Sequence, residues 1–263
     1  AATANAYFRN AAGVPLHYVD RLPFGHPLEG MEETYQDASS GYEAPAAILI
    51  EPIQAEGGVN VADEAWLKEI RQFAKDRGAL FIIDDIQAGC GRTGSYFSFD
   101  GMDLDPDIIT LAKGIGGFGT PLAMNLNKPE FDKHWSPGEH TGTFRGQGIS
   151  FVAGKVAMDY FKDDSFMKEV RAKGDLMRTH LQKMAGPGME VRGKGMMQGL
   201  DTKDGALAKK IVAECFRTGL LVGGCGSEGR VIKLIPPLTI PEDDLKQGLG
   251  LLEKAVQSVM EPA

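Results

Sequence analysis

The sequence has few cysteines and no long apolar run, and both absences narrow what the protein can be. Its three cysteines form an odd number and no CxxC pair. This argues against a disulfide framework and against a metal site such as a zinc centre, and it is typical of a reducing cytoplasm. No apolar stretch is long enough to cross a bilayer, and residues 1–6 lack the basic and hydrophobic regions of a signal peptide. We therefore expect a cytoplasmic protein with no membrane partner.

Basic residues are too few to form a surface for nucleic acid. The chain has 28 lysine and arginine residues against 36 acidic ones, which gives a formal net charge of -8. Without a basic stripe to meet phosphates, we expect no nucleic-acid partner. The length of 263 residues and the hydrophobic content of 43% are sufficient for one large domain or two small ones.

The first half of the chain has the pattern of an α/β fold. Residues 46–50 are continuously apolar, which predicts a strand buried on both faces. A helix is expected between Asp63, which suits an N-cap, and Gly78, which suits a C-terminal cap, and another strand over 79–83. Strands joined by a helix in this way form a right-handed βαβ unit, so the sheet is expected to be mostly parallel. Further strands are expected over 108–111 and 122–126.

The second half of the chain has long amphipathic segments and is predicted to form a smaller α/β unit. Helices are expected over 151–161, 166–184 and 206–218 and after Pro241, and strands over 189–200, 220–222 and 231–235. We place the boundary near residue 150, which gives a large domain over 1–150 and a small C-terminal α/β domain over 151–263.

An acid and a lysine end two of the apolar runs in the large domain. Asp84 ends the run that begins at Phe81, and Lys113 ends the run that begins at Asp107. The carboxyl ends of parallel strands meet at one edge of a sheet, where ligands bind. A lysine can hold pyridoxal 5'-phosphate as a Schiff base, and an acid can keep the ring nitrogen of this cofactor protonated. The pair therefore indicates a pyridoxal-phosphate site, although each residue alone is more often a solvated side chain.

Further polar residues are expected around the same crevice. Gln87 is placed near the ring hydroxyl oxygen and Thr143 near the phosphate, with Glu51 and Glu56 lining the crevice. Thr143 and Glu51 could equally lie in solvated loops, and the five histidines show no metal-ligand spacing. The run 114–119 matches GxGxxG, but another strand follows it in place of a helix, which argues against a dinucleotide site.

Four motifs in order and spacing resemble those of the class III aminotransferases, which are pyridoxal-phosphate enzymes of fold type I. The motifs are Glu51-Pro-Ile-Gln-Ala-Glu56, Asp84-Asp-Ile-Gln87 with Gly91-Arg-Thr-Gly94, Lys113, and Gly138-Glu-His to Thr143. The resemblance covers the whole chain. It implies a large domain with a mostly parallel sheet and a small C-terminal α/β domain.

The resemblance also implies a role for each matching residue. Lys113 is similar to the Schiff-base lysine and proton shuttle, Asp84 to the acid at the pyridine nitrogen, and Gln87 to the residue beside the ring oxygen. Thr143 is similar to a residue that reaches the cofactor phosphate of the neighbouring subunit, so a homodimer or higher homo-oligomer is expected. Glu56 matches a glutamate that pairs with an arginine in ornithine and aminobutyrate transaminases.

Residues 84–94 and 135–146 are most similar to the diaminobutyrate transaminases of ectoine biosynthesis. That family moves the amino group of L-glutamate to L-aspartate 4-semialdehyde and gives L-2,4-diaminobutyrate and 2-oxoglutarate. The resemblance implies these small-molecule substrates for this chain. The same scaffold also hosts ornithine- and aminobutyrate-type transaminases, aminomutases and decarboxylases, and a truncated, non-catalytic paralogue is a further alternative.

Two departures from the family pattern affect the expected site. Lys233 stands where ornithine-type relatives have the arginine partner of Glu56, and a lysine cannot form a bidentate fork with a carboxylate. We assign Lys233 and Glu56 to substrate binding. The family's upstream glycine and threonine loop for the phosphate and its ring-stacking aromatic residue do not occur in the sequence. We therefore expect either a fragment or a chain preceded by further residues.

Overall fold

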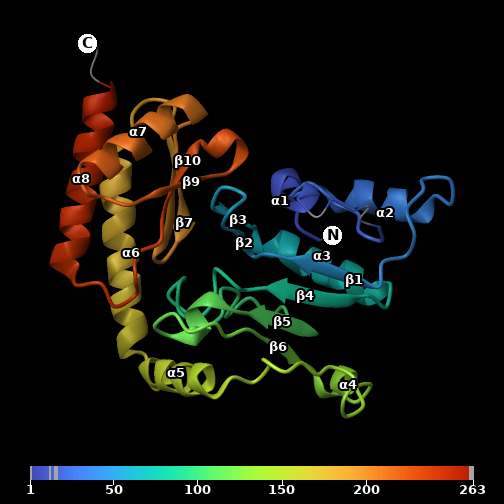
Figure 1. Cartoon of the computed structure of the whole chain (residues 1–263). Helices are drawn as coiled ribbons and strands as arrows, with labels where there is room; N and C mark the ends of the chain where they lie inside the picture. The colour runs from blue at the N-terminus through green and yellow to red at the C-terminus, as the bar shows by residue number, and fades with distance from the viewer. Residues whose placement is uncertain (1, 12, 15–16, 261–263) are drawn as a thin grey trace.

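The computed structural model describes residues 2–11, 13–14 and 17–260, which form two four-stranded sheets, a two-stranded sheet and flanking helices (Figure 1). The helices are α1 (Ala6–Asn10), α2 (Leu28–Gln36), α3 (Glu64–Asp76), α4 (Pro129–Asp132), α5 (Gly148–Met158), α6 (Ser165–Met184), α7 (Gly205–Arg217) and α8 (Glu242–Met260), with the 3-10 helices η1 (Lys113–Gly116), η2 (Asp159–Phe161) and η3 (Ser227–Gly229). The strands are β1 (Ala47–Ile50), β2 (Ile53–Gln54), β3 (Asn60–Val61), β4 (Leu80–Asp84), β5 (Ile108–Leu111), β6 (Met124–Asn127), β7 (Glu190–Lys194), β8 (Met197–Asp201), β9 (Gly223–Cys225) and β10 (Val231–Leu234). No helix in the described ranges is long and apolar enough to span a membrane.

The first sheet has the order β1-β4-β5-β6 and is mostly parallel, as predicted. Strands β1, β4 and β5 run parallel, and β6 pairs antiparallel with β5. Helix α3 forms where the sequence predicted it. The Asp63 side chain accepts a hydrogen bond from the backbone N–H of Trp66, and Gly78 has a φ of +64° after the last turn. The apolar face of α3 packs on the sheet where Phe81 and Ile83 are fully buried.

The opposite face of this sheet is less covered than predicted. Leu49 in β1 is 48% exposed, so the expectation that residues 46–50 are buried on both faces is wrong. A continuous apolar run indicates a strand, but it carries no information on whether an element of the same chain covers each face. The exposed face therefore remains available to other groups.

The second sheet has the order β7-β8-β10-β9 and is antiparallel. Helix α6 contacts β7 and β8, α7 contacts β9 and β10, and α8 packs against both helices. Figure 1 shows these helices on one side of the sheet, while the other side faces β2 and β3. A buried cluster centred on Val170, Met177, Leu200, Ile211 and Leu252 fills the space between the sheet and the helices.

Two strand predictions in this unit are wrong. The segment 189–200 forms two antiparallel strands, because Gly195 has a φ of +55° and the chain reverses there. The predicted strand over 220–222 lies too early, since the observed strand is β9 and Leu221 is 84% exposed. Hydrophobicity alone placed both strands, whereas hydrogen bonding to a neighbouring strand decides their limits.

The Gly91-Arg-Thr-Gly94 motif joins the two units. The Arg92 guanidinium donates to the backbone carbonyls of Met196 and Pro236, and the Met196 N–H donates to the Arg92 carbonyl at 2.9 Å. Burial lowers the pKa of Arg92 to about 10. The Gly94 carbonyl accepts a hydrogen bond from Arg171 of α6 at 2.7 Å. The boundary near residue 150 stays a prediction, and helix α5 next to it packs against η1.

Candidate active site

A hollow of about 380 Å³ lies where β4 and β5 end. Its walls come from the less covered face of the first sheet and from the segment after α4. The lining residues are Leu49, Asp84, Ile86, Thr110, Leu111, Ala123, Met124, Asn125 and His140. Small-molecule sites have volumes of roughly 300–1,000 Å³, so the hollow is large enough for a ligand.

A carboxylate and an unpartnered hydroxyl line this hollow. Asp84 is the last residue of β4 and pairs with Thr110 of β5. The half-buried Asp84 accepts a hydrogen bond at Oδ1 from the backbone N–H of Ile86 at 3.0 Å. The buried Thr110 hydroxyl has no hydrogen-bond partner among the described residues. Buried polar atoms normally have partners, so this hydroxyl is suited to contact a ligand. The sequence analysis used Thr110 only as a strand residue, and no local signal distinguishes it.

Glu51 shares the electrostatic surroundings of this edge. Burial raises the pKa of Glu51, and the charge of Asp84 adds to that rise. The charge of Lys113 acts in the opposite direction and lowers the pKa of the same carboxyl group. The residues that follow β1, β4 and β5 therefore lie within electrostatic range of one another, as the parallel arrangement of the strands predicted.

Lys113 begins the 3-10 helix η1, two residues after β5. Its φ of +52° is in the left-handed region, which is uncommon for residues other than glycine. Helix α5 supports this turn closely, since a Cβ at Gly117 would lie 3.2 Å from the Ala153 carbonyl oxygen. The Lys113 side chain is exposed, whereas an amine that attacks a carbonyl must be partly desolvated. The described residues leave this side chain uncovered.

A second polar cluster contains the three residues Glu56, Gln87 and Lys233. Lys233 on β10 is 8% exposed and donates from Nζ to the Glu56 carboxylate and, at 3.0 Å, to Gln87 Oε1. Gln87 Nε2 donates to Glu56 Oε1 at 3.2 Å. Partial burial by itself would raise the pKa of Glu56, but the hydrogen bonds from Lys233 and Gln87 hold it below its usual value. The structure thus brings together these three residues, which are far apart in the sequence.

The segment after α4 contributes His140 to the hollow, while the predicted role of Thr143 towards a neighbouring subunit stays a prediction. Thr143 is exposed and does not line the hollow, whereas His140 does. The sequence analysis treated His140 as structural, because a lone histidine carries no spacing signal. Its ring lies 5.5 Å from that of Trp135. Among the described residues, no group of three or more His, Cys, Asp or Glu side chains is arranged to hold a metal ion.

Comparisons with known proteins match this fold and this set of motifs. The family model "Aminotransferase class-III" matches residues 27–256. A diaminobutyrate–2-oxoglutarate transaminase of Nocardia farcinica is 44% identical over 267 residues, which cover 98% of this chain and 61% of the relative. An enzyme of the same name from Bordetella parapertussis is 43% identical over 273 residues, which cover 99% of this chain and 62% of the relative. The chain thus spans less than two thirds of the length of these relatives.

Solved structures agree with the sequence comparisons. The acetylornithine aminotransferase from Elizabethkingia anophelis superposes with a TM-score of 0.77 at 30% identity, covering 91% of this chain and 60% of that chain. The architecture is therefore fold type I of the pyridoxal-phosphate-dependent transferases. The chain belongs to the class III aminotransferase family.

The residue types at the ends of β4 and β5 fit the cofactor of this family, with Asp84 in the lining of the hollow and Lys113 outside that lining. Pyridoxal phosphate needs an amine for covalent attachment and a carboxylate near its ring nitrogen. Here Lys113 follows β5 and Asp84 ends the adjacent β4, with the unpartnered Thr110 hydroxyl between the two strands' ends. The amine and the carboxylate that the cofactor needs are therefore both present at the ends of two adjacent strands.

Proposed function

We propose that the protein is a pyridoxal-phosphate-dependent transaminase that transfers the amino group of L-glutamate to L-aspartate 4-semialdehyde. The products would be L-2,4-diaminobutyrate and 2-oxoglutarate, as in ectoine biosynthesis. The observation that carries the proposal is the placement of Asp84 at the end of β4, where it lines the hollow, and of Lys113 two residues after the paired parallel strand β5. The names of the relatives from Nocardia farcinica and Bordetella parapertussis support the choice of substrates.

Each residue at the hollow has a distinct task in this proposal. Pyridoxal phosphate supplies an electron sink for the carbanion that forms at the substrate Cα. Lys113 holds the cofactor covalently and then carries the proton away from Cα. Asp84 keeps a proton on the ring nitrogen, and preorganised charge of this kind contributes several kcal/mol in many enzymes. Gln87 uses one N–H for Glu56, and its second N–H is suited to the ring oxygen.

Glu56 and Lys233 are proposed to bind the polar end of the substrate. The Lys233 cation can pair with a carboxylate of L-glutamate or 2-oxoglutarate once Glu56 turns aside. The Glu56 side chain is 62% exposed, so little packing opposes this movement. In the present position, Glu56 can instead accept hydrogen bonds from an ammonium group such as that of L-2,4-diaminobutyrate.

A second copy of the chain is proposed to cover the exposed parts of the site. Helix α5 carries an exposed apolar stripe of Ile149, Val152 and Val156, which are 68%, 65% and 57% exposed. Exposed apolar patches next to a functional site commonly mark interfaces. A symmetric dimer through α5 would bring the exposed Thr143 of one subunit towards the cofactor phosphate of the other, and would shield Lys113.

Borohydride reduction tests the central assignment. The protein, incubated with pyridoxal phosphate, is reduced and its peptides are mapped by mass spectrometry. We expect one irreversible cofactor adduct on the peptide that contains Lys113, and none in the Lys113→Ala variant. An adduct confined to other lysines would show that the assignment of Lys113 is wrong, and no adduct at all would favour a non-catalytic paralogue.

A labelled substrate separates transamination from the other reactions of the scaffold. L-Glutamate carrying a nitrogen label is supplied together with L-aspartate 4-semialdehyde. We expect the label in L-2,4-diaminobutyrate. An aminomutase would leave the label in a rearranged product of the donor, and a decarboxylase would release carbon dioxide without transfer of nitrogen.

A further inference from the structure

Glu56 lies in a strained turn between β2 and β3. The N–H groups of Gly58 and Val59 both donate to the Ala55 carbonyl at 3.2 Å. Val59 has a φ of +54°, which is unfavourable for a β-branched residue, and Gly58 has a φ of +119°. Such a conformation persists only where the surroundings determine it. The contacts that hold this turn therefore also determine where Glu56 points.

The second sheet holds the turn at two backbone points. The Gly226 N–H donates to the Glu56 carbonyl at 2.9 Å, and Arg192 Nε donates to the Gly58 carbonyl at 2.8 Å. Val59 is fully buried against β8 and β10, and a Cβ at Gly199 would lie 3.0 Å from its side chain. Of the two hydrogen bonds to the turn, one is donated by a backbone N–H and the other by the Arg192 side chain. Only the bond from Arg192 can be removed by a side-chain substitution.

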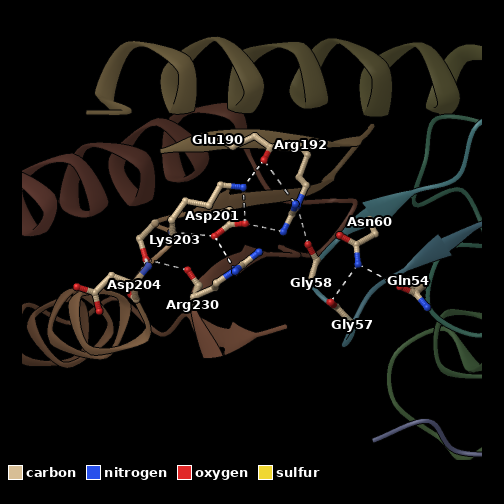
Figure 2. Close-up of polar contacts among 11 residues, drawn as sticks. Gln54, Gly57, Gly58, Asn60, Glu190, Arg192, Asp201, Lys203, Asp204 and Arg230 are labelled. Atoms are coloured by element: carbon tan, nitrogen blue, oxygen red, sulfur yellow. Dashed lines mark hydrogen bonds and ion pairs between the residues drawn. The ribbon is translucent and has the colours of Figure 1, made fainter. Parts of the chain in front are cut away.

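Arg192 is itself fixed by a buried ionic network, which Figure 2 shows. Its Nη2 lies 2.9 Å from Asp201 Oδ2, and the Asp201 side chain is completely buried. Lys203 and Arg230 contact the same carboxylate at 3.0 and 3.2 Å. The Asp201 carboxylate holds each of the three cations in a narrow range of positions, because a cation that moved away would leave a buried charge with one partner fewer.

We infer that Arg192, anchored on Asp201, is a positioning residue that orients Glu56 towards Lys233 and Gln87 and thereby sets substrate affinity. Within the described residues, Arg192 does not line the hollow and has no hydrogen bond or ion pair with the Glu56 carboxylate, so it acts through its contact with Gly58, whose carbonyl it bonds. Its effect on catalysis rests on the proposed function, in which Glu56 and Lys233 bind substrate. Its effect on the turn is independent of that function.

The test compares Arg192→Met with Arg178→Met as a matched control. Arg178 on α6 also donates to a backbone carbonyl of the second sheet, that of Gly193 in β7 at 3.0 Å, but it makes no hydrogen bond to the turn among the described residues. In Arg192→Met we expect amide exchange at Gly58 and Val59 to speed up by about 10-fold, the effect of losing one charge-assisted hydrogen bond. In Arg178→Met we expect no change at these amides.

The kinetics of the cofactor-loaded enzyme give a second readout. We expect Arg192→Met to raise the KM for L-glutamate by about 10-fold while kcat changes by less than about 2-fold, because Lys113 and Asp84 are untouched. Arg192→Lys keeps a positive charge near Asp201, but one ammonium group cannot bond both Asp201 and the Gly58 carbonyl as the guanidinium does. We therefore expect its KM for L-glutamate to lie between those of the unaltered protein and Arg192→Met. This variant also serves as the test if Arg192→Met fails to fold.

The two proposals fail in different ways. An unaltered protein without transaminase activity, combined with faster exchange at residues 58 and 59 in Arg192→Met, would overturn the proposed function and leave the positioning role standing. An active transaminase in which Arg192→Met matches Arg178→Met in both exchange and KM would overturn the positioning role. Equal changes of kcat and KM in both variants would also overturn the positioning role, since they would show a general structural effect.

Discussion

Asp84 and Asp85 are neighbours in sequence but have opposite surroundings. Asp84 lines the hollow, whereas Asp85 is completely buried and accepts a hydrogen bond from the Ser98 N–H at 3.1 Å. Asp85 Oδ1 has no hydrogen-bond partner within the described part of the chain. Burial raises the pKa of Asp85 to about 6. Two identical side chains that are neighbours in the chain therefore differ in burial and in hydrogen bonding.

Asp85 should make stability depend on pH. A carboxyl group with a pKa raised from 3.8 to about 6 stabilises the folded state fully below pH 3.8 and loses that contribution as pH rises through 6. We expect the free energy of unfolding to increase by about 1–2 kcal/mol between pH 8 and pH 5 from this group. Urea denaturation of the native protein and of Asp85→Asn at both values measures the difference. An equal pH response in the two proteins would contradict the assignment.

Substitution of Lys233 should change the substrate affinity strongly. It is buried and is bonded to both Glu56 and Gln87. In Lys233→Met we expect the KM for L-glutamate to rise by about 10-fold or more, since a charge-assisted contact is lost, with a smaller change in kcat. Steady-state kinetics measure both. Lys246→Met, which removes an exposed pair with Glu242, is the control and should have no effect.

At the scale of single elements, two glycines in helices should respond oppositely to alanine. A Cβ at Gly174 in α6 would lie 2.6 Å from backbone atoms of Gly195, so alanine there forces the helix away from the β7–β8 turn. We expect Gly174→Ala to destabilise the protein by about 1–3 kcal/mol. Gly250 in α8 has no atom within 4 Å of its Cβ position, and Gly250→Ala should stabilise by about 0.5–1 kcal/mol. Thermal unfolding of both variants checks the signs, and equal signs would refute the close approach.

Elements with a strong local pattern could be predicted from the sequence. Helix α3 has an N-cap at Asp63 and an apolar face, and both were visible in the sequence. The β7–β8 turn was missed because Gly195 lies in a short connection between two strands of mixed polarity and gives a weak signal. Strands β2 and β3 have two residues each and exist through their packing on the second sheet, so no local pattern announces them.

In the site, too, residues with a local sequence pattern could be predicted, whereas residues defined by contacts between distant segments could not. The sequence placed Asp84 and Lys113 together through the rule for parallel strands. The three-residue cluster of Glu56, Gln87 and Lys233 was assembled from the family resemblance and not from spacing. Arg192 was missed altogether, because its role depends on a contact with Gly58, which lies 134 positions earlier. Contacts of this range become visible only when the two sheets are placed against each other.

At the scale of the whole molecule, the α5 stripe should control association. We expect Val152→Glu to convert the proposed dimer into monomers, because a charge on this stripe would have to be desolvated at the interface. Sedimentation over a range of concentrations measures the association. Phe216→Glu on α7 replaces another exposed apolar residue, 73% exposed, on the other unit and should leave the dimer intact. Monomers in the unaltered protein, or equal behaviour of both variants, would contradict a dimer through α5.

The left-handed backbone at Lys113 has a consequence for the evolution of the protein. Glycine and asparagine adopt a φ of +52° at lower cost than lysine, for which the left-handed region is unfavourable by about 1–2 kcal/mol. Selection for thermal resistance alone would replace Lys113, and every such replacement would remove the amine. If Lys113 carries the proposed reaction, a more heat-resistant descendant that keeps this reaction must gain its stability at other positions.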